Sequence, residues 1–356
     1  MERTRTGECL ESYNRAPLRP HGRCRRPPPA LRVAVRAGAV GSLIAAIAVP
    51  LARRRLGTPA AVTIAATAAG PLALAVLTPR TRTRDAALYA LQMWAFAQAH
   101  EIPYDDPEAL RRRLRIRYPI LADRVLGGGE LPGVRLQRAL SAPGRVTALD
   151  RALSLVHWAW FFEPHLTLLF IQARHLERFP RAARQMAAVY DLGCAVYFAL
   201  PTAPPWWAAE EGHLDAELEH VSAAVFAEAE LEAAARSPAL RRVMIDVGEE
   251  VWGDTWGTLY DSLGGNPWAA MPSLHFATSL MAALLLEEVG PLAGALGWSY
   301  ALALGFALVY LGEHYLTDLL AGGVLVAAVR RGEPLAEPVV EAANRVLRRL
   351  ERIAAA

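Results

Sequence analysis

Two adjoining segments decide the fold. Residues 271–289 read MPSLHFATSLMAALLLEEV, and residues 291–318 read PLAGALGWSYALALGFALVYLGEHYLTD. Each contains an apolar run of membrane-helix length, and Pro272 suits the first turn of a helix, where its missing N–H costs nothing. The sequence therefore predicts a helical hairpin that crosses the membrane within residues 272–286 and returns within 291–311.

The hairpin places three reactive side chains together. Two crossings return the chain to its starting face, so His275 and His314 are expected at the same face of the membrane. His314 and Asp318 are four residues apart and share one side of a helix. The segment 201–207 leaves the membrane at that same face, because the polar residues between it and Pro272 cannot span.

These residues carry a family resemblance. The sequence Pro-Ser-Leu-His at 272–275, followed one hairpin later by His-x-x-x-Asp at 314–318, resembles the phosphatidic acid phosphatase type 2 superfamily of lipid phosphatases and phosphotransferases. Residues 198–207, FALPTAPPWW, are similar to the inositolphosphotransferase branch, typified by inositol phosphorylceramide synthase. Together with the apolar runs, the resemblance implies an all-α polytopic bundle of about six or seven transmembrane helices with a helical extramembrane insertion. It covers residues 150 to 331, approximately.

Composition divides the chain into consecutive parts. We predict a disordered Arg/Pro-rich tail at 1–30, membrane helices at 31–78, a polar Arg-rich segment at 79–150, a catalytic membrane domain at 151–331 with its insertion at 206–265, and an amphipathic tail helix at 332–356. The amphipathic stretch 84–100 suits a membrane surface, and a soluble helix hairpin is an equal alternative.

Charge and cysteine content limit the function classes. All 38 basic residues are arginine, and the net charge of +3 is too small to indicate nucleic-acid binding. Three scattered cysteines imply no disulfide framework. No cofactor is predicted, and the expected partners are membrane lipids: a phospholipid or polyprenyl phosphate donor, and a lipid alcohol or water as acceptor.

The resemblance implies a role for each site residue. His314 is the nucleophile that forms a phosphohistidine, and Asp318 accepts a hydrogen bond from its other ring nitrogen. His275 protonates the leaving oxygen and then serves as base for the incoming hydroxyl. The apolar run 152–173 also contains ionisable residues, among them His157 and Glu163, which either function in the site or pair inside the bundle.

The phosphate-binding residues of the superfamily are missing. Its first motif needs a lysine, which this chain lacks, and Ala307-Leu308 stands where its third motif has Ser-Arg. Candidate substitutes are Arg241 and Arg242, helped by N–H groups around Ser273, although both arginines could simply be solvated. Pro204, Pro205 and Trp206 could line the headgroup site or anchor the chain at the membrane interface.

The predicted function is lipid phosphotransfer through phosphohistidine, most like a phosphoinositol transferase, with a lipid phosphate or polyprenyl diphosphate phosphatase as the alternative. Two other classes remain open: a metal-dependent hydrolase with His275, His314 and Asp318 as ligands, and a non-enzymatic transporter or scaffold. The resemblance favours a multi-pass protein of the cell membrane whose site faces the extracytoplasmic side. The arginine-rich segments before residue 151 fit that orientation poorly.

Overall fold

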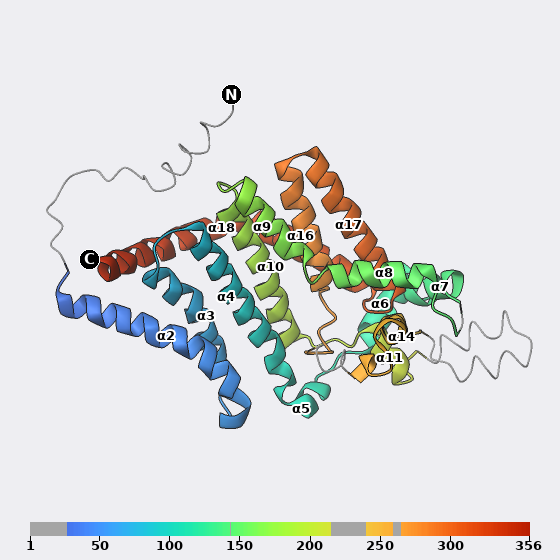
Figure 1. Cartoon of the computed structure of the whole chain (residues 1–356). Helices are drawn as coiled ribbons and strands as arrows, with labels where there is room; N and C mark the ends of the chain where they lie inside the picture. The colour runs from blue at the N-terminus through green and yellow to red at the C-terminus, as the bar shows by residue number, and fades with distance from the viewer. Residues whose placement is uncertain (1–26, 143, 215–239, 259–264) are drawn as a thin grey trace, which may run out of the picture. The chain divides into compact units, whose positions relative to one another are not determined.

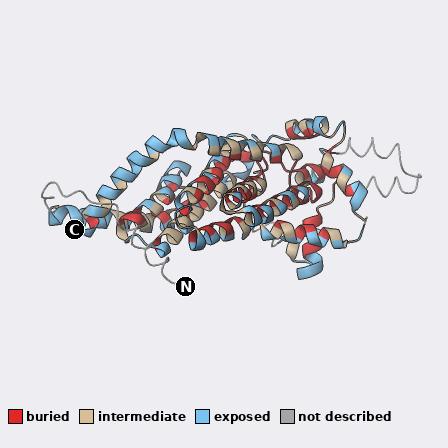
Figure 2. Ribbon diagram, turned by 90° about the horizontal axis from the view of Figure 1, so that it is seen from above, coloured by how far each residue is buried: buried red, intermediate tan, exposed pale blue. Residues whose placement is uncertain are grey.

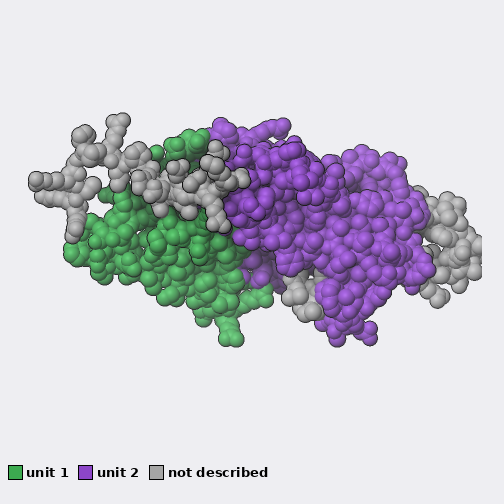
Figure 3. Space-filling view, turned by 45° about the horizontal axis from the view of Figure 1, so that its top comes forward, with its two compact units in different colours: residues 1–95, 337–356 green, residues 96–336 purple. Residues whose placement is uncertain are grey.

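The computed structural model describes residues 27–142, 144–214, 240–258 and 265–356. Within these ranges the chain is all-α, as predicted, with isolated bridges but no β-strand. It forms two compact units, one of residues 1–95 with 337–356 and one of residues 96–336 (Figure 3). Most of the predicted tail at 1–30, and residues 215–239 and 259–264 of the predicted insertion, lie outside the described residues.

The first unit is built on two apolar helices, α2 (Pro29–Leu56) and α3 (Ala60–Leu77). Gly57 ends α2 with a left-handed backbone (φ 60°), which lets the chain reverse into α3. The two helices approach closely, because a Cβ added at Gly70 would lie 2.9 Å from the Cβ of Ala46. The first part of α4 (Arg82–Glu101) joins them through Trp94, whose indole N–H donates to the Ala46 carbonyl at 2.9 Å.

The second unit carries the predicted catalytic segments (Figure 1). After the end of α4 it contains the following elements in chain order: η1 (Ile102–Asp105), α5 (Pro107–Arg111), α6 (Arg117–Leu126), α7 (Pro132–Leu140), α8 (Ala148–Ala159), α9 (Glu163–Arg174), α10 (Phe179–Ala199), α11 (Pro205–Glu210), α14 (Val243–Trp252), α16 (Leu274–Val289), α17 (Pro291–Tyr310) and the first part of α18 (Leu316–Ala355).

The helical hairpin predicted from residues 272–311 is present as α16 and α17, which run side by side (Figure 1). Glycines on α17 allow a close approach. A Cβ at Gly294 would lie 2.8 Å from the Glu287 Cα, and one at Gly297 would lie 2.8 Å from the Ala283 Cα. Backbone contact of this kind is typical of small residues between membrane helices, and it fixes the hairpin that carries both histidines.

Two helix boundaries differ from the sequence prediction. The apolar run 152–173 forms α8 and α9 rather than one helix, and the chain turns between Ala159 and Glu163. Pro164 explains the break, because proline suits the first turn of a new helix and disfavours a helical residue before it. The tail helix predicted over residues 332–356 is continuous with the helix before it, because α18 runs as one helix from Leu316 to Ala355.

Three described helices, α2, α3 and α17, are long and apolar enough to cross a membrane, so the chain is membrane-associated. On α17 the side chains of Leu292, Leu296 and Leu302 are exposed, as lipid-facing residues are. Buried residues gather inside the helix bundle and exposed residues on its outside (Figure 2). The count of six or seven spans stays a prediction, because α8, α9 and α16 are shorter than a bilayer-spanning helix.

Candidate active site

His275 lies in the first turn of α16, and three contacts fix that turn. The Ser273 hydroxyl caps the helix by accepting from the Phe276 N–H at 3.2 Å. The Ser273 N–H donates to the Asp318 carbonyl oxygen at 3.0 Å, and the Tyr197 hydroxyl donates to the Pro272 carbonyl at 2.8 Å. The start of α16 is thereby tied to both α18 and α10.

His314 lies in the short loop between α17 and α18. Gly312 adopts a left-handed backbone (φ 77°) that turns the chain after α17, and the His314 N–H donates to the Leu308 carbonyl at 3.1 Å. Asp318 follows in the first turn of α18. The predicted four-residue spacing therefore does bring the two side chains together.

The three predicted catalytic residues form one hydrogen-bonded chain. The Asp318 Oδ2 is 3.2 Å from the His314 Nδ1, and the His314 Nε2 is 3.1 Å from the His275 Nδ1. His314 and Asp318 are buried. Since a carboxylate only accepts, it assigns the His314 proton to Nδ1 and leaves a lone pair on Nε2. His275 then donates its Nδ1–H to that lone pair, so the nitrogen expected to attack phosphorus and the expected acid are in contact.

His157 of α8 and Trp160 of the turn after it pack against the His275 ring. Only His157 is among the ionisable residues that the sequence analysis names. The ring of Trp160 lies 4.1 Å from that of His275, centroid to centroid, and its indole N–H donates to the Thr278 hydroxyl at 2.8 Å. The His157 ring lies 4.9 Å away. His157 could be singled out from the sequence, because it is an ionisable residue inside an apolar run. Trp160 could not, because nothing in the sequence distinguished it from an aromatic residue at the membrane interface.

His100, at the end of α4, contacts a residue that holds the start of α16. Its ring lies 5.6 Å from that of Tyr197, the residue that holds the Pro272 carbonyl. Burial lowers the pKa of His100 to about 4, against an opposing effect of Glu101. His100 is therefore neutral at pH 7 and adds no positive charge beside the two histidines of the site.

Asp123 was not predicted as a site residue, yet it holds the start of α18. Its carboxylate accepts from the backbone N–H groups of Leu316 at 2.8 Å and Thr317 at 2.7 Å, and also from the Thr317 hydroxyl. Burial raises the pKa of the Asp123 carboxyl, and the bonds from Thr317 and Leu316 oppose that rise. A side chain of α6 thus supplies the N-terminal cap of the helix that carries Asp318.

Asp123→Ala is expected to lower stability by about 1–3 kcal/mol and to lower kcat, because three donors lose a buried acceptor at the helix that orients His314. Thermal unfolding and steady-state kinetics measure both effects. Asp106→Ala is the matched control: Asp106 caps the exposed helix α5 by accepting from the Ala109 N–H at 2.9 Å. A variant that loses stability but keeps the wild-type kcat would contradict a positioning role for Asp123.

Gly322 lets α18 lie against the start of α16. A Cβ at this position would come within 2.9 Å of the Ser273 carbonyl oxygen, a backbone atom that has no room to move without shifting His275. The neighbouring Gly323 is open, because its added Cβ would first meet the Leu280 Cδ2 at 3.9 Å. Substituting each glycine therefore distinguishes an effect of close packing at the site from the general effect of replacing a glycine in a helix.

Gly322→Ala is expected to lower kcat and to destabilise the protein by about 1–3 kcal/mol through overpacking. Gly323→Ala should leave activity unchanged and be neutral or stabilising, since alanine is the better helix former. The pair is compared by kcat and by thermal unfolding of the purified proteins. Equal behaviour of the two variants would show that the contact of Gly322 with Ser273 does not position His275.

The proline-rich segment lies beside the His314 loop, where the crossing argument places it. The Trp206 N–H donates to the Gly312 carbonyl at 3.0 Å, two residues before His314. Thr202 pairs as an isolated bridge with Arg115 on one side and with Ala269 on the other. Pro204 is buried and Trp206 is half-buried next to this loop.

Arg242 and Trp206 form a stacked pair near the same loop. The guanidinium carbon of Arg242 lies 3.7 Å from the Trp206 ring centroid, which is the geometry of a cation–π contact. A nitrogen of Arg242 also lies 3.8 Å from a carboxylate oxygen of Glu210. The proposed arginine and the proposed headgroup wall are thus in direct contact.

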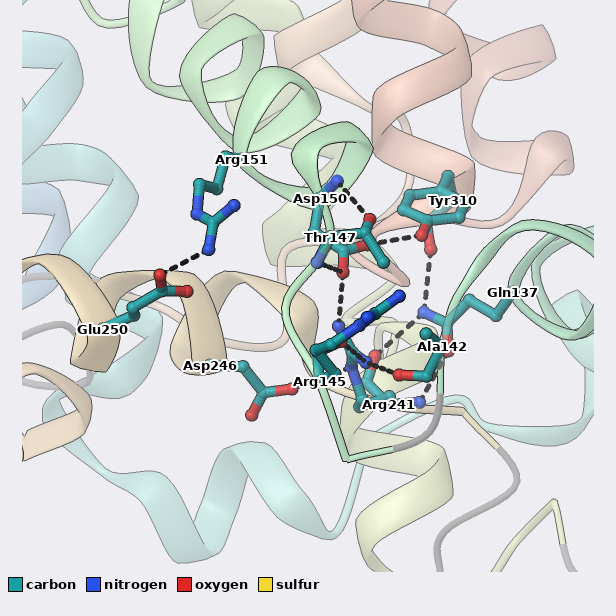
Figure 4. Close-up of polar contacts among 10 residues, drawn as sticks. All are labelled: Gln137, Ala142, Arg145, Thr147, Asp150, Arg151, Arg241, Asp246, Glu250 and Tyr310. Atoms are coloured by element: carbon teal, nitrogen blue, oxygen red, sulfur yellow. Dashed lines mark hydrogen bonds and ion pairs between the residues drawn. The ribbon is translucent and has the colours of Figure 1, made fainter.

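Arg241 lies in a separate polar network at the start of α8 (Figure 4). Its guanidinium pairs with Asp150 at 2.9 Å and with Asp246 at 2.8 Å, and it donates to the carbonyls of Ala142 and Arg145. Gln137 accepts from the Arg241 N–H at 2.7 Å. A phosphate ligand would have to compete with two carboxylates for Arg241.

Two further observations complete the site. Ser273 keeps its hydroxyl at the α16 start as the helix cap, next to the His275 backbone. Among the residues that the structure describes, no group of three His, Cys, Asp or Glu side chains has the geometry to hold a metal ion. The Nδ1–H of His314 is bound to Asp318, and the Nε2 lone pair of His314 accepts from His275.

Comparison with known proteins gives one match. The family model of the PAP2 superfamily matches residues 136–330, more than half of the chain, and this stretch contains every predicted site residue. A search of curated proteins and a search of solved structures each found no match.

Proposed function

Because the chain belongs to the PAP2 superfamily, we propose that it is an integral membrane enzyme that transfers a phosphate-linked lipid headgroup through a phosphohistidine. Superfamily members are generally phosphatases or phosphotransferases, which supports an enzyme acting on lipid phosphates. The observation that carries the proposal is the contact chain from Asp318 through His314 to His275, with links of 3.2 and 3.1 Å.

The proposed reaction has two halves. In the first, the His314 Nε2 attacks phosphorus, the bond from phosphorus to the leaving oxygen breaks, and the His275 Nδ1 gives that oxygen its proton. In the second, His275 takes the proton of an incoming hydroxyl, which attacks phosphorus and releases His314. Asp318 stabilises the positive charge that His314 carries in between.

We assign substrate binding to the residues around the His314 loop. Arg242 is the candidate cation for the phosphate or headgroup, with Trp206 and Pro204 as a wall, and the N–H groups at the α16 start next to Ser273 as further donors. Arg241 was proposed for the same role. Its network with Asp150 and Asp246 would instead let it act indirectly, by fixing the start of α8.

Transfer of phosphoinositol to a lipid alcohol is the specific reaction that we propose. It rests on the likeness of residues 198–207 to the inositolphosphotransferase branch and on the absence of the superfamily's usual lysine and arginine. Hydrolysis of a lipid phosphate or polyprenyl diphosphate is the alternative, because water and an alcohol can use the same base.

We further propose a multi-pass arrangement in which the active site faces the extracytoplasmic side. The arginines at the end of α9, just before α10 and in its first turns (Arg174, Arg178, Arg181 and Arg184) would then be cytoplasmic, in agreement with the positive-inside rule. Labelling of single cysteines placed at residues 212 and 177 in intact cells tests this: reagent that cannot cross membranes should reach the first position only.

The reaction is tested with purified protein in vesicles that contain one donor each: phosphatidylinositol with a lipid alcohol, phosphatidic acid, or a polyprenyl diphosphate. Mass spectrometry of the lipids detects headgroup transfer, and released inorganic phosphate detects hydrolysis. Transfer of phosphoinositol supports the specific proposal. Phosphate release alone would replace it by the phosphatase alternative.

Two controls separate the remaining classes. Turnover that is lost in a strong chelator and restored by a divalent ion would favour the metal-dependent hydrolase. A wild-type protein that turns over none of the three donors, and whose deletion leaves cellular lipids unchanged, would favour a transporter or scaffold and refute the enzyme proposal.

A further inference from the structure

His157 lies on the buried face of α8. That face consists of Asp150, Leu153, Ser154 and His157, which follow the spacing of one helix side, and only 1% of His157 is exposed. The first of these residues fixes the helix, since Asp150 accepts from the Tyr310 hydroxyl and pairs with Arg241 (Figure 4). The His157 ring is therefore held in place by its own helix.

Neither ring nitrogen of His157 has a hydrogen-bond partner among the described residues. Buried polar groups are nearly always hydrogen-bonded, so an imidazole with both nitrogens unpaired requires an explanation. Phenylalanine would fill the same space without losing a donor and an acceptor. The two ring nitrogens of His157 are thus polar atoms that no described residue of the protein hydrogen-bonds.

That place is the active site. The His157 ring packs on the His275 ring, with centroids 4.9 Å apart and planes 34° from parallel, and it lies within electrostatic range of His314. A phosphorus atom attacked by the His314 Nε2 must replace the 3.1 Å contact between His314 and His275. A phosphoryl group that enters there also comes beside His157.

We infer, on the basis of the proposed function, that His157 is a third active-site histidine and donates a hydrogen bond to a non-bridging oxygen of the transferred phosphoryl group. A neutral imidazole always has one N–H to donate, and it does so without adding a charge next to protonated His275. It would supply part of the phosphate binding that the missing lysine and arginine provide elsewhere in the superfamily.

The hydrogen bond changes none of the proton transfers. His275 still protonates the leaving oxygen while the bond from His314 to phosphorus forms, and it recovers a proton from the incoming hydroxyl when that bond breaks. His157 keeps its own proton throughout. Its contribution is to the negative charge on the oxygens that stay with phosphorus, which is the main requirement of phosphoryl transfer.

Orthovanadate, which mimics the transferred phosphoryl group in the transition state, is the probe. Its dissociation constant is measured by equilibrium binding to full-length protein in detergent, independently of turnover. His157→Phe keeps a ring against His275 but removes the donor, and His157→Gln keeps an N–H donor but removes the ring. His165→Phe is the control for the same change at a histidine whose ring lies 6.5 Å from Tyr190 in the neighbouring helix.

The inference predicts that His157→Phe weakens vanadate binding about 10- to 100-fold, as for loss of one hydrogen bond to a charged group. His157→Gln should stay within about tenfold of the wild type and bind vanadate more tightly than His157→Phe. The control His165→Phe should bind like the wild type. If His157→Phe does not fold, as judged by thermal unfolding, His157→Met serves as the donor-free variant.

Wild-type binding in the donor-free variant would overturn the inference and leave the proposed function intact. So would equal weakening in His157→Gln and His157→Phe, because that result assigns the effect to ring packing on His275. If the wild-type protein binds no vanadate and forms no phosphoenzyme, the proposed function fails, and the inference fails with it.

Discussion

His314→Ala is expected to abolish phosphotransfer, with kcat lowered by at least about 10⁴-fold, because the variant has no nitrogen to attack phosphorus. In the structure Asp318 contacts the Nδ1 of His314, so the lone pair available for attack is on Nε2, the nitrogen that faces His275. Incubation with a donor labelled on phosphorus, followed by an alkaline quench, should trap acid-labile label on wild-type protein and none on the variant.

The matched control for this prediction is His175→Ala. His175 lies after α9, with its ring 5.7 Å from that of Phe170, and it is not one of the proposed site residues. Its variant should keep both turnover and label. Wild-type turnover in purified His314→Ala would refute the phosphohistidine mechanism. Label on another residue would keep covalent catalysis but reassign the nucleophile.

The arrangement of His275, His314 and Asp318 could be predicted from sequence because it follows from local rules. Proline and serine before His275 specify a helix start, four-residue spacing joins His314 to Asp318, and the crossing argument brings the two segments to one face. The hairpin of α16 and α17 required only apolar length. None of these steps depends on how distant helices pack.

The supporting residues could not be predicted, because their roles depend on tertiary packing. Asp123 is separated from Thr317 by 194 positions, and no local pattern marks an aspartate on α6 as a cap for α18. Trp160 likewise packs on His275 from the turn between α8 and α9, where the apolar run is broken before Pro164. The same break sets the position of α8, and with it that of His157.

Arg241 illustrates the limit of reasoning from charge alone. Two adjacent arginines on the correct side of the membrane suggested a phosphate clamp, but position in the sequence does not show which carboxylates lie nearby. In the structure Arg241 pairs with Asp150 and Asp246, whereas Arg242 stacks on Trp206. The two adjacent side chains therefore have different surroundings: Arg242 contacts Trp206 beside the His314 loop, and Arg241 contacts the carboxylates at the start of α8 and on α14.

His275→Ala is expected to lower kcat about 10²- to 10⁴-fold with an alkyl phosphate ester as donor, because the departing alkoxide then receives no proton. A nitrophenyl phosphate ester, whose leaving group needs no protonation, should lose far less in the first half of the reaction. The second half still lacks its base, so phosphoenzyme should accumulate in the variant, and a burst of nitrophenol should precede slow turnover.

The expected difference between the two esters follows from the 3.1 Å contact between the His275 Nδ1 and the His314 Nε2, which places the proton of His275 beside the attacking nitrogen. Equal losses with both esters in the rate of the first half would show that His275 orients His314 instead of transferring protons. Absence of label in the variant would place its role before the attack on phosphorus.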